Sequence, residues 1–316
     1  MAGGSGKAVA AFGSVNIDVT GFCYRLPRAG ETVPGSRSTT TLGGKGANQA
    51  AAAARLGDAS LMIGRIGADA FGALARERLS ALAVDSAYLL STSGVATGMA
   101  LITVDAKAEN CIVVNGGANA RVDQSVVDNA AVPLRAASAL LLQLEVPLGP
   151  SLAAAALTRA GGGLVIFDPA PAPREGLPQA AYAAIDIITP NETETEALVG
   201  IRPESAADAA RAAAVLASRG APTAIIKMGA RGAFYRSPQG EGFVPPFAVR
   251  AVNSVGAGDC FNGALAVALG RGDPLPEAVR FAAACGALAT TGPGGAEAAP
   301  TLAAARDLLA RSPSLA

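Results

Sequence analysis

The chain has 316 residues, of which 51% are hydrophobic and 16% are charged, a composition that supports a sizeable core and excludes a largely disordered protein. Its 25 Lys and Arg balance its 25 Asp and Glu, and this net charge of zero argues against nucleic acid or an anionic membrane as the main partner. Because the sequence has no histidine, catalysis by Ser-His-Asp or Cys-His groups and histidine-ligated metals are excluded.

Apolar runs of strand length alternate along the chain with alanine-rich segments of helix length. The expected strands are Ala8–Val15, Ser60–Ile66, Ala139–Leu144, Leu164–Asp168, Ile185–Thr189 and Thr223–Met228. The expected helices are Asn48–Leu56, Phe71–Leu82, Ser151–Arg159, Ala206–Arg219, Asp259–Leu269 and Leu275–Thr290. Continuous apolar strands separated by helices predict an α/β protein with a mainly parallel central sheet covered by helices on both faces, a three-layer sandwich.

Two segments break this alternation. Residues 16–42 carry Pro and Gly turns without a helical period, and residues 97–115 predict a β-hairpin with strands near Gly98–Val104 and Asn110–Val114. Because an isolated hairpin needs something to pack against, we expect the two segments to form a small β-sheet that projects as a lid. No interdomain linker is apparent, so residues 1–316 are predicted to form one domain with this lid inserted.

The cysteines indicate a reducing compartment. Cys23, Cys111, Cys260 and Cys285 lie far apart and form no CxxC pair, and neither a signal peptide nor a membrane span is apparent. We therefore expect reduced thiols in a cytoplasmic protein without a membrane partner.

A glycine-rich segment, Gly43-Gly44-Lys45-Gly46-Ala47-Asn48, comes just before the first expected helix. Glycines let the backbone approach a ligand, amides at a helix start favour oxygen-rich partners, and Lys45 and Asn48 add donors for hydroxyl groups. Asn16 and Asp18 follow the first strand and point to the same side, while Glu145 follows strand 139–144. Each of these features alone also fits an ordinary turn, cap or surface residue.

The strongest signal is Asn253-Ser-Val-Gly-Ala-Gly-Asp259, in which two glycines precede an acid that opens an apolar helix. The amides of Gly256, Ala257 and Gly258, reinforced by the helix dipole, would form an anion hole, and an ionised Asp259 could accept a proton. The alternative is a plain aspartate N-cap.

Two further segments follow expected strands. Pro190-Asn191-Glu-Thr-Glu194 could orient a hydrated magnesium ion, or simply start a helix with acidic residues. Lys227-Met-Gly229-Ala-Arg-Gly232 could touch phosphates or a nucleotide, or form a tight hairpin turn.

Together these motifs resemble, in order and place, the ribokinase-like (PfkB-type) carbohydrate kinases. The resemblance extends from about Val9 to Pro300 and is carried by Gly13–Asp18, Gly43–Ala50, Gln143–Glu145, Asp168–Ala172, Thr189–Glu194 and Gly256–Gly263. It implies a Rossmann-like sandwich whose small β lid closes over a sugar and often pairs with a second lid to form a homodimer.

The resemblance also implies roles for single residues. Those that would bind the sugar are Asn16, Asp18, Gly44, Lys45, Gly46, Asn48, Glu145 and Asp259. Asp259 would be the catalytic base beside an anion hole made by Gly256, Ala257 and Gly258. The residues along ATP would be Asn191, Lys227, Gly229, Gly232 and Gly258, with Glu194 near hydrated Mg²⁺.

The chain departs from the family at a monovalent-cation site. Asn253 stands where an aspartate is common, and Ala298 where a serine hydroxyl is offered. The remaining ligands would be backbone carbonyls near Val255, Ala289, Gly292 and Gly294. Because a charge and a hydroxyl are lost, we expect K⁺ to bind more weakly and to activate less steeply. Ala283 replaces a histidine often found near the adenine, which predicts a looser purine pocket.

The expected activity is ATP-dependent phosphorylation of the 5-hydroxyl of D-ribose. The alternatives are a kinase for another sugar, such as deoxyribose or fructose, a nucleoside kinase, and a non-catalytic sugar sensor. A nucleoside kinase needs an apolar or aromatic wall for the base, which aromatics at 4% of the chain disfavour. The retained Asp259 and its Gly-Ala-Gly turn argue against a sensor.

Overall fold

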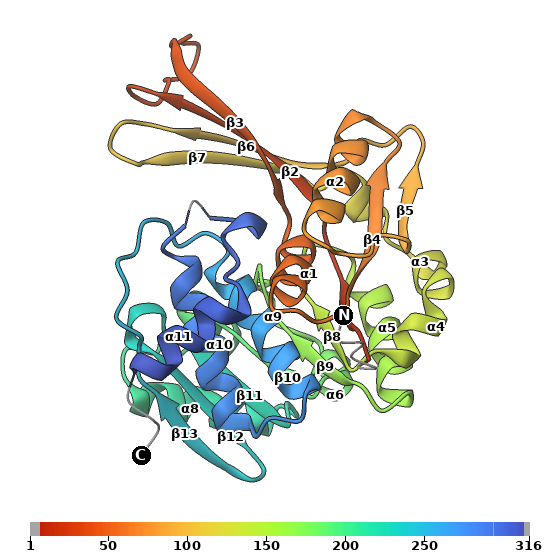
Figure 1. Cartoon of the computed structure of the whole chain (residues 1–316), viewed down its shortest axis with the longest axis vertical. Coiled ribbons are helices and arrows are strands. Elements are labelled where there is room, and N and C mark those ends of the chain that lie inside the picture. The colour runs from red at the N-terminus through yellow and green to blue at the C-terminus, as the bar shows by residue number, and fades with distance from the viewer. Residues whose placement is uncertain (1–6, 293, 313–316) are drawn as a thin grey trace.

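Nine strands form the central sheet of the computed structural model, which describes residues 7–292 and 294–312 (Figure 1). Their spatial order is β13-β12-β11-β10-β9-β8-β1-β4-β5. The bounds are Val9–Phe12 (β1), Ser60–Gly67 (β4), Leu89–Thr92 (β5), Ala139–Leu142 (β8), Leu164–Phe167 (β9), Ile187–Ile188 (β10), Thr223–Lys227 (β11), Ala233–Ser237 (β12) and Gly240–Val244 (β13). Neighbours from β11 to β5 pair in parallel, and β11, β12 and β13 pair antiparallel.

Helices cover both faces of this sheet, as the apolar strands predict. Along β1, Val9 and Ala11 belong to one core cluster, whereas Ala10 and Phe12 belong to the other. The first cluster includes residues of Lys45–Arg55 (α1), Ala70–Ala81 (α2), Ala257–Gly270 (α9), Leu275–Ala289 (α10) and Leu302–Arg311 (α11). The second includes residues of Gln124–Asn129 (α3), Ala131–Ala136 (α4), Leu148–Ala160 (α5), Gln179–Ala184 (α6), Glu192–Val199 (α7) and Ala206–Ser218 (α8). The predicted three-layer α/β architecture is therefore confirmed.

A second, four-stranded sheet extends away from this body at the top of Figure 1. Its order is β3-β2-β6-β7, with bounds Asn16–Cys23 (β2), Gly35–Gly43 (β3), Gly98–Val104 (β6) and Asn110–Asn115 (β7). The pairs β2–β3 and β6–β7 are antiparallel, and β2–β6 is parallel. The expected small sheet is thus present, and every residue of β7 is exposed.

Several predicted boundaries were wrong by a few residues. Helix α1 begins at Lys45 instead of Asn48, because Gly44 adopts a left-handed φ of 87° and ends the preceding strand there. Helix α9 begins at Ala257, two residues before the predicted start. Strand β10 spans only Ile187–Ile188, because Ile185 still caps helix α6.

Among the described residues, no helix combines the length and apolarity needed to cross a membrane.

Candidate active site

The polar residues singled out in the sequence gather where the parallel strands end. Glu145 follows β8, Asp168 follows β9, Asn191 follows β10, and Lys227 is the last residue of β11. Parallel strands place their carboxyl ends at one edge of the sheet, and the N-termini of α1 and α9 reach the same edge. Hydrogen bonds join residues of these elements that lie 100 to 211 positions apart in the sequence, so the candidate site is a single cluster.

Asp259 lies in the first turn of α9 but does not cap it. The N-cap is Gly256, with φ 82°, and it has no side-chain cap. The buried Asp259 carboxylate instead accepts hydrogen bonds across the helix pair, from Asn48 Nδ2 at 2.9 Å on Oδ2 and from Gln49 Nε2 at 3.1 Å on Oδ1. The plain N-cap alternative is therefore wrong, and Asp259 faces helix α1.

The glycine turn before Asp259 is only partly free to bind an anion. The Ala257 amide donates to the Ser254 carbonyl at 3.2 Å, whereas the amides of Gly256 and Gly258 donate to no described residue. An anion held by all three amides therefore requires the Ala257 bond to open.

Lys45 carries positive charge into this acidic cluster. Its backbone amide donates to Glu145 Oε2 at 3.0 Å. Burial alone would lower the pKa of the Lys45 ammonium, but the surrounding carboxylates of Asp259, Asp168, Glu145 and Glu194 outweigh burial and raise that pKa above its ordinary value. Lys45 therefore stays charged beside Asp259.

Asp18 and Glu145 form a pair of neighbouring carboxylates at the base of the small sheet. Burial, followed by repulsion from Glu145, raises the pKa of Asp18 to about 6. Glu145 is held by the hydroxyl of buried Ser14, with Oγ to Oε2 at 2.5 Å. A Cβ at Gly43 would overlap the Asp18 carboxylate as it is placed here, so a larger residue would displace this side chain.

The remaining predicted sugar ligands line the same region. Asn16 is fixed by the amide of Asn119, which donates to Asn16 Oδ1 at 2.7 Å. A Cβ at Gly44 would lie 2.8 Å from the Asn16 nitrogen, and one at Gly46 would lie 2.7 Å from the Ser14 nitrogen. Asn48 is 7% exposed, and its Oδ1 has no hydrogen-bond partner among the described residues. A ligand hydroxyl is the natural donor for such an orphaned acceptor.

A further ion pair of the site joins β11 to the loop after β9. Lys227 Nζ contacts Asp168 Oδ1 at 3.0 Å, and a Cβ at Gly258 would lie 3.5 Å from this Nζ. The ammonium group is therefore close to the glycine turn.

Glu194 and Asn191 form the capping box of α7, so the helix-start alternative holds for this pair. Burial raises the pKa of Glu194, with Asp168 adding to the rise and Lys227, the Asn191 amide and Lys45 opposing it. These charges place Glu194 beside the ion pair. Lys227 and Gly232 also flank the turn between antiparallel β11 and β12, as the hairpin alternative predicted.

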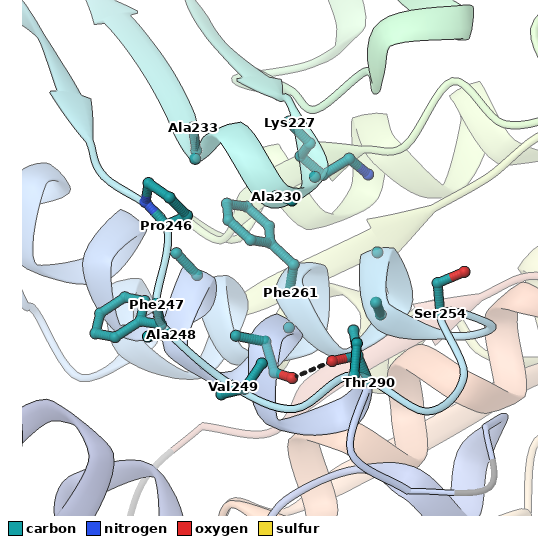
Figure 2. A pocket seen from close by; sticks show the side chains of 18 residues that line it. Lys227, Ala230, Ala233, Pro246, Phe247, Ala248, Val249, Ser254, Phe261 and Thr290 are labelled. Atoms are coloured by element: carbon teal, nitrogen blue, oxygen red, sulfur yellow. Dashed lines mark hydrogen bonds between the residues drawn. The ribbon is translucent and has the colours of Figure 1, made fainter.

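A cavity of about 540 Å³ opens next to Lys227 and Gly258 (Figure 2). Pro246, Phe247, Val249 and Phe261 make it apolar at one end, and Lys227 and Ser254 lie toward the other end. Predicted residues Gly229, Gly232 and Ala283 also line it, whereas Asn191 does not. Residues 246–249 carry no motif, so no sequence pattern indicates their place in the cavity wall.

Several predicted monovalent-cation ligands lie near one another, and three of their oxygens each accept one hydrogen bond. Asn253 Oδ1 accepts from the Val255 amide at 2.9 Å, and the carbonyls of Val255 and Ala289 accept from Gly295 and Gly292 at 3.2 and 3.3 Å. A Cβ at Gly294 would lie 2.6 Å from Asn253 Nδ2, so these loops touch. The described residues contain no cluster of three or more His, Cys, Asp or Glu that could hold a metal. The donors that this loop offers to a cation are neutral amide and carbonyl oxygens.

Fold and site together combine a buried carboxylate, a glycine turn at a helix start and an adjacent cavity of about 540 Å³, an arrangement suited to a phosphotransferase. Residues 7–302 match the family model described as pfkB family carbohydrate kinase. The chain therefore belongs to the pfkB family of carbohydrate kinases, enzymes that transfer a phosphoryl group to a sugar hydroxyl.

Relatives within this family carry more specific names. The chain is 36% identical to a ribokinase of Haemophilus influenzae, over 93% of this chain and 96% of that protein. It is 34% identical to a deoxyribokinase of Salmonella typhi, also over 93% and 96%. The structure of Arabidopsis thaliana ribokinase complexed with ribose and ATP superposes with a TM-score of 0.91 at 31% identity, covering 97% of this chain and all of that chain.

Proposed function

We propose that this enzyme transfers the γ-phosphoryl group of ATP to the 5-hydroxyl of D-ribose, with Asp259 as the general base. The observation that carries the proposal is the placement of the buried Asp259 carboxylate between Asn48, Lys45 and the glycine turn of α9. The similarity to a ribokinase that binds ribose and ATP supports the choice of substrates.

The sugar is proposed to lie between the small sheet and the N-terminus of α1. Asp18 and Glu145 accept hydrogen bonds from its hydroxyl groups, and Lys45 donates to its oxygens. Asn48 Oδ1, which lacks a partner among the described residues, accepts from a further hydroxyl. Asn16, Gly44 and Gly46 complete this wall by bringing the backbone close to the sugar.

Asp259 is proposed to remove the proton of the attacking hydroxyl. A primary alcohol is hardly ionised at neutral pH, so the proton must leave as the bond to phosphorus forms. Burial raises the pKa of Asp259, Lys45 lowers it, and Asp168 raises it again, while the amides of Asn48 and Gln49 stabilise the ionised form. Such a base is stronger than an exposed aspartate yet stays charged beside Lys45.

ATP is proposed to occupy the apolar cavity, with its base near Phe247 and Phe261 and its phosphates toward Lys227 and the turn Gly256–Gly258. Gly229 and Gly232 line this cavity, and Asn191, outside its wall, is proposed to reach the phosphates from the start of α7. Mg²⁺ enters as part of the MgATP substrate, where it neutralises phosphate charge, and Glu194 is proposed to orient its waters. The Gly258 amide and the Lys227 ammonium stabilise the transferred group.

Two finer features belong to this proposal. K⁺ is proposed to activate weakly, because Asn253 brings no charge to its loop and Ala298 no hydroxyl. The small sheet is proposed to act as a lid, formed by about residues 16–42 and 97–115, and to pair with a second copy, because β7 exposes Ile112, Val113 and Val114. All four cysteines are free, which suits the cytoplasm.

A coupled assay of ADP release over D-ribose, 2-deoxy-D-ribose, D-fructose and adenosine tests the substrate. We expect kcat/KM for D-ribose to exceed that for every other acceptor by roughly tenfold or more, because a site built for a hydroxyl is left with unpaired polar groups when that hydroxyl is missing. A preference for 2-deoxy-D-ribose would reassign the substrate to that of the deoxyribokinase relatives. Sugar binding without ADP release from any acceptor would support a sensor.

A further inference from the structure

Two fully buried glutamines extend the polar cluster behind Asp259. Gln143 Nε2 donates to Gln49 Oε1 at 2.7 Å, and both residues are 0% exposed. Gln49 Nε2 donates to Asp259 Oδ1 at 3.1 Å and to Asp168 Oδ2 at 3.0 Å. Because the Gln49 oxygen accepts from Gln143, its NH₂ group must face the two carboxylates. The hydrogen bond from Gln143 therefore helps to fix which way the Gln49 amide faces.

This amide limits how the Asp259 carboxylate can turn. Gln49 holds Oδ1, and its neighbour Asn48 holds Oδ2 at 2.9 Å. With one donor on each oxygen, rotation of the carboxylate breaks at least one bond. Asn48 is also a proposed sugar ligand through its Oδ1, whereas Gln49 is 0% exposed and is not among the proposed sugar ligands.

The same amide separates two negative charges. Asp168, in the loop after β9, faces Asp259 and is itself paired with Lys227 of β11. Lys45 faces Asp259 from α1, and Asn48 and Gln49 are the other polar groups of α1 that contact it. The Gln49 NH₂ group donates one hydrogen to each carboxylate and so bridges Asp168 and Asp259. These two hydrogen bonds offset the repulsion between the two negative charges.

We propose that Gln49 is a positioning residue for the phosphoryl transfer, which holds the carboxylate of Asp259 in place and in its ionised form next to Asp168, and that Gln143 sets the direction of the Gln49 amide. This inference rests on the proposed role of Asp259 as the base. Neither glutamine touches substrate, so both act through Asp259.

The kinetic test compares pH profiles of kcat with MgATP and ribose for the full-length enzyme and for Gln49→Met, which removes both donors at similar volume. We expect kcat of the variant to fall roughly 10–100-fold at the acid end of the profile and by less as pH rises, because loss of both donors raises the pKa of Asp259 and higher pH restores its ionised form. The KM for ribose should change less than about threefold, because no sugar contact is lost.

Two further variants interpret this result. Gln143→Met should give the same pH-dependent pattern at smaller amplitude, because it releases the Gln49 amide without removing it. Ser151→Ala, a buried residue of α5 whose hydroxyl donates to the Pro147 carbonyl, should show no such pattern. Wild-type kcat in Gln49→Met, or an equal loss at every pH, would overturn the proposal.

A second measurement needs no substrate and so stands apart from the proposed function. The melting temperature of Gln49→Met should fall further below that of the unmodified protein as pH rises from 5 to 9. The reason is that the ionised Asp259 carboxylate lacks the Gln49 hydrogen bond in the folded variant. This pH dependence should vanish in an Asp259→Asn background. If it persists there, the titrating group is not Asp259 and the positioning role is refuted. Should Gln49→Met fail to fold, Gln143→Met is compared in the same two backgrounds.

Discussion

Paired carboxylates dominate the site at the scale of single residues. Asp18 and Glu145 lie close enough for Glu145 to add to the burial that raises the pKa of Asp18 to about 6. Asp18 thus carries its proton more readily than an exposed aspartate. Its ionised form is the better acceptor for sugar hydroxyls. The buried charge therefore favours sugar binding, although it lowers the stability of the folded protein.

This balance predicts a pH dependence of sugar binding. As pH falls through about 6, Asp18 takes up a proton, and the KM for ribose should rise while the KM for ATP stays nearly constant. The measurement is kcat/KM for each substrate between pH 5 and 8. A ribose KM that is flat across this interval would contradict the raised pKa of Asp18.

Stability should move the opposite way. The pKa of folded Asp18 lies above its ordinary value of 3.8, so the folded state binds more protons than the unfolded state between about pH 4 and 6. The free energy of unfolding therefore falls as pH rises through this interval. Above about pH 6 the full destabilisation by the buried charge is present. Asp18→Asn should therefore stabilise the protein at pH 8 by about 1–3 kcal/mol and weaken ribose binding about tenfold or more. Denaturant unfolding and ribose titration test both halves, and a destabilised variant would refute the account.

The residue-scale site was only partly predictable. Asn16, Lys45, Asn48 and Asp259 stand in motifs dense enough for the sequence alone to indicate a site. Gln49 and Asp168 belong to those same motifs, yet nothing local shows that they meet across 119 residues of sequence. Such long-range pairs depend on which strands become neighbours, and the one-dimensional pattern does not contain that order.

At the scale of elements, the loop before α9 carries the residues on which the proposed weak response to K⁺ rests. Asn253 brings no charge to it, and its amide oxygen accepts from Val255. The side chain therefore serves the loop conformation itself.

Activity should consequently depend weakly on K⁺. Replacing K⁺ with tetramethylammonium at constant ionic strength should change kcat/KM less than about threefold, because no fixed charge is available to hold the ion. Asn253→Asp restores that charge and should steepen the dependence, with Val132→Ala at an exposed position of α4 as the control. A strict, high-affinity K⁺ requirement in the unmodified enzyme would contradict this view.

Several exposed apolar residues of the described chain gather on the small sheet, namely Leu101, Ile112, Val113 and Val114. Asp18 is paired in register with Ala100, and Ala100 with Val114, so these three residues share one face. Val19, Leu101 and Val113 share the opposite face, where Val113 is 66% exposed. Both faces of β7 thus remain open to solvent.

We expect a second copy of the chain to cover the exposed apolar residues of β7. Val113→Glu places a charge on the face away from Asp18, and it should convert dimers to monomers in sedimentation velocity, because a buried unpaired charge is costly at an interface. Val132→Glu on α4 should leave the dimer intact. A monomer in the unmodified protein at micromolar concentration would contradict the pairing.

At the scale of the whole molecule, the alternation of strands and helices dictates where the chemistry occurs. Alternate residues of β1 belong to the two core clusters, one on each face of the sheet. A continuous apolar run in the sequence therefore predicted helices on both faces. The antiparallel hairpin β12–β13 was not predicted, and the strand predicted at Ile185–Thr189 is shorter than expected, because tertiary pairing rather than local apolarity sets both. The parallel edge brings α1 and α9 together, and Asp259 meets Asn48 and Lys45 there.

The most direct test of this account is turnover by Asp259→Asn with saturating MgATP and ribose. Loss of the proton acceptor should lower kcat roughly 10²–10⁴-fold, about 3–5 kcal/mol of barrier, while the variant keeps its fold and binds ribose within a few-fold of the unmodified enzyme. A variant that binds ribose normally and turns over at near the unmodified rate would contradict the assignment of Asp259 as the base.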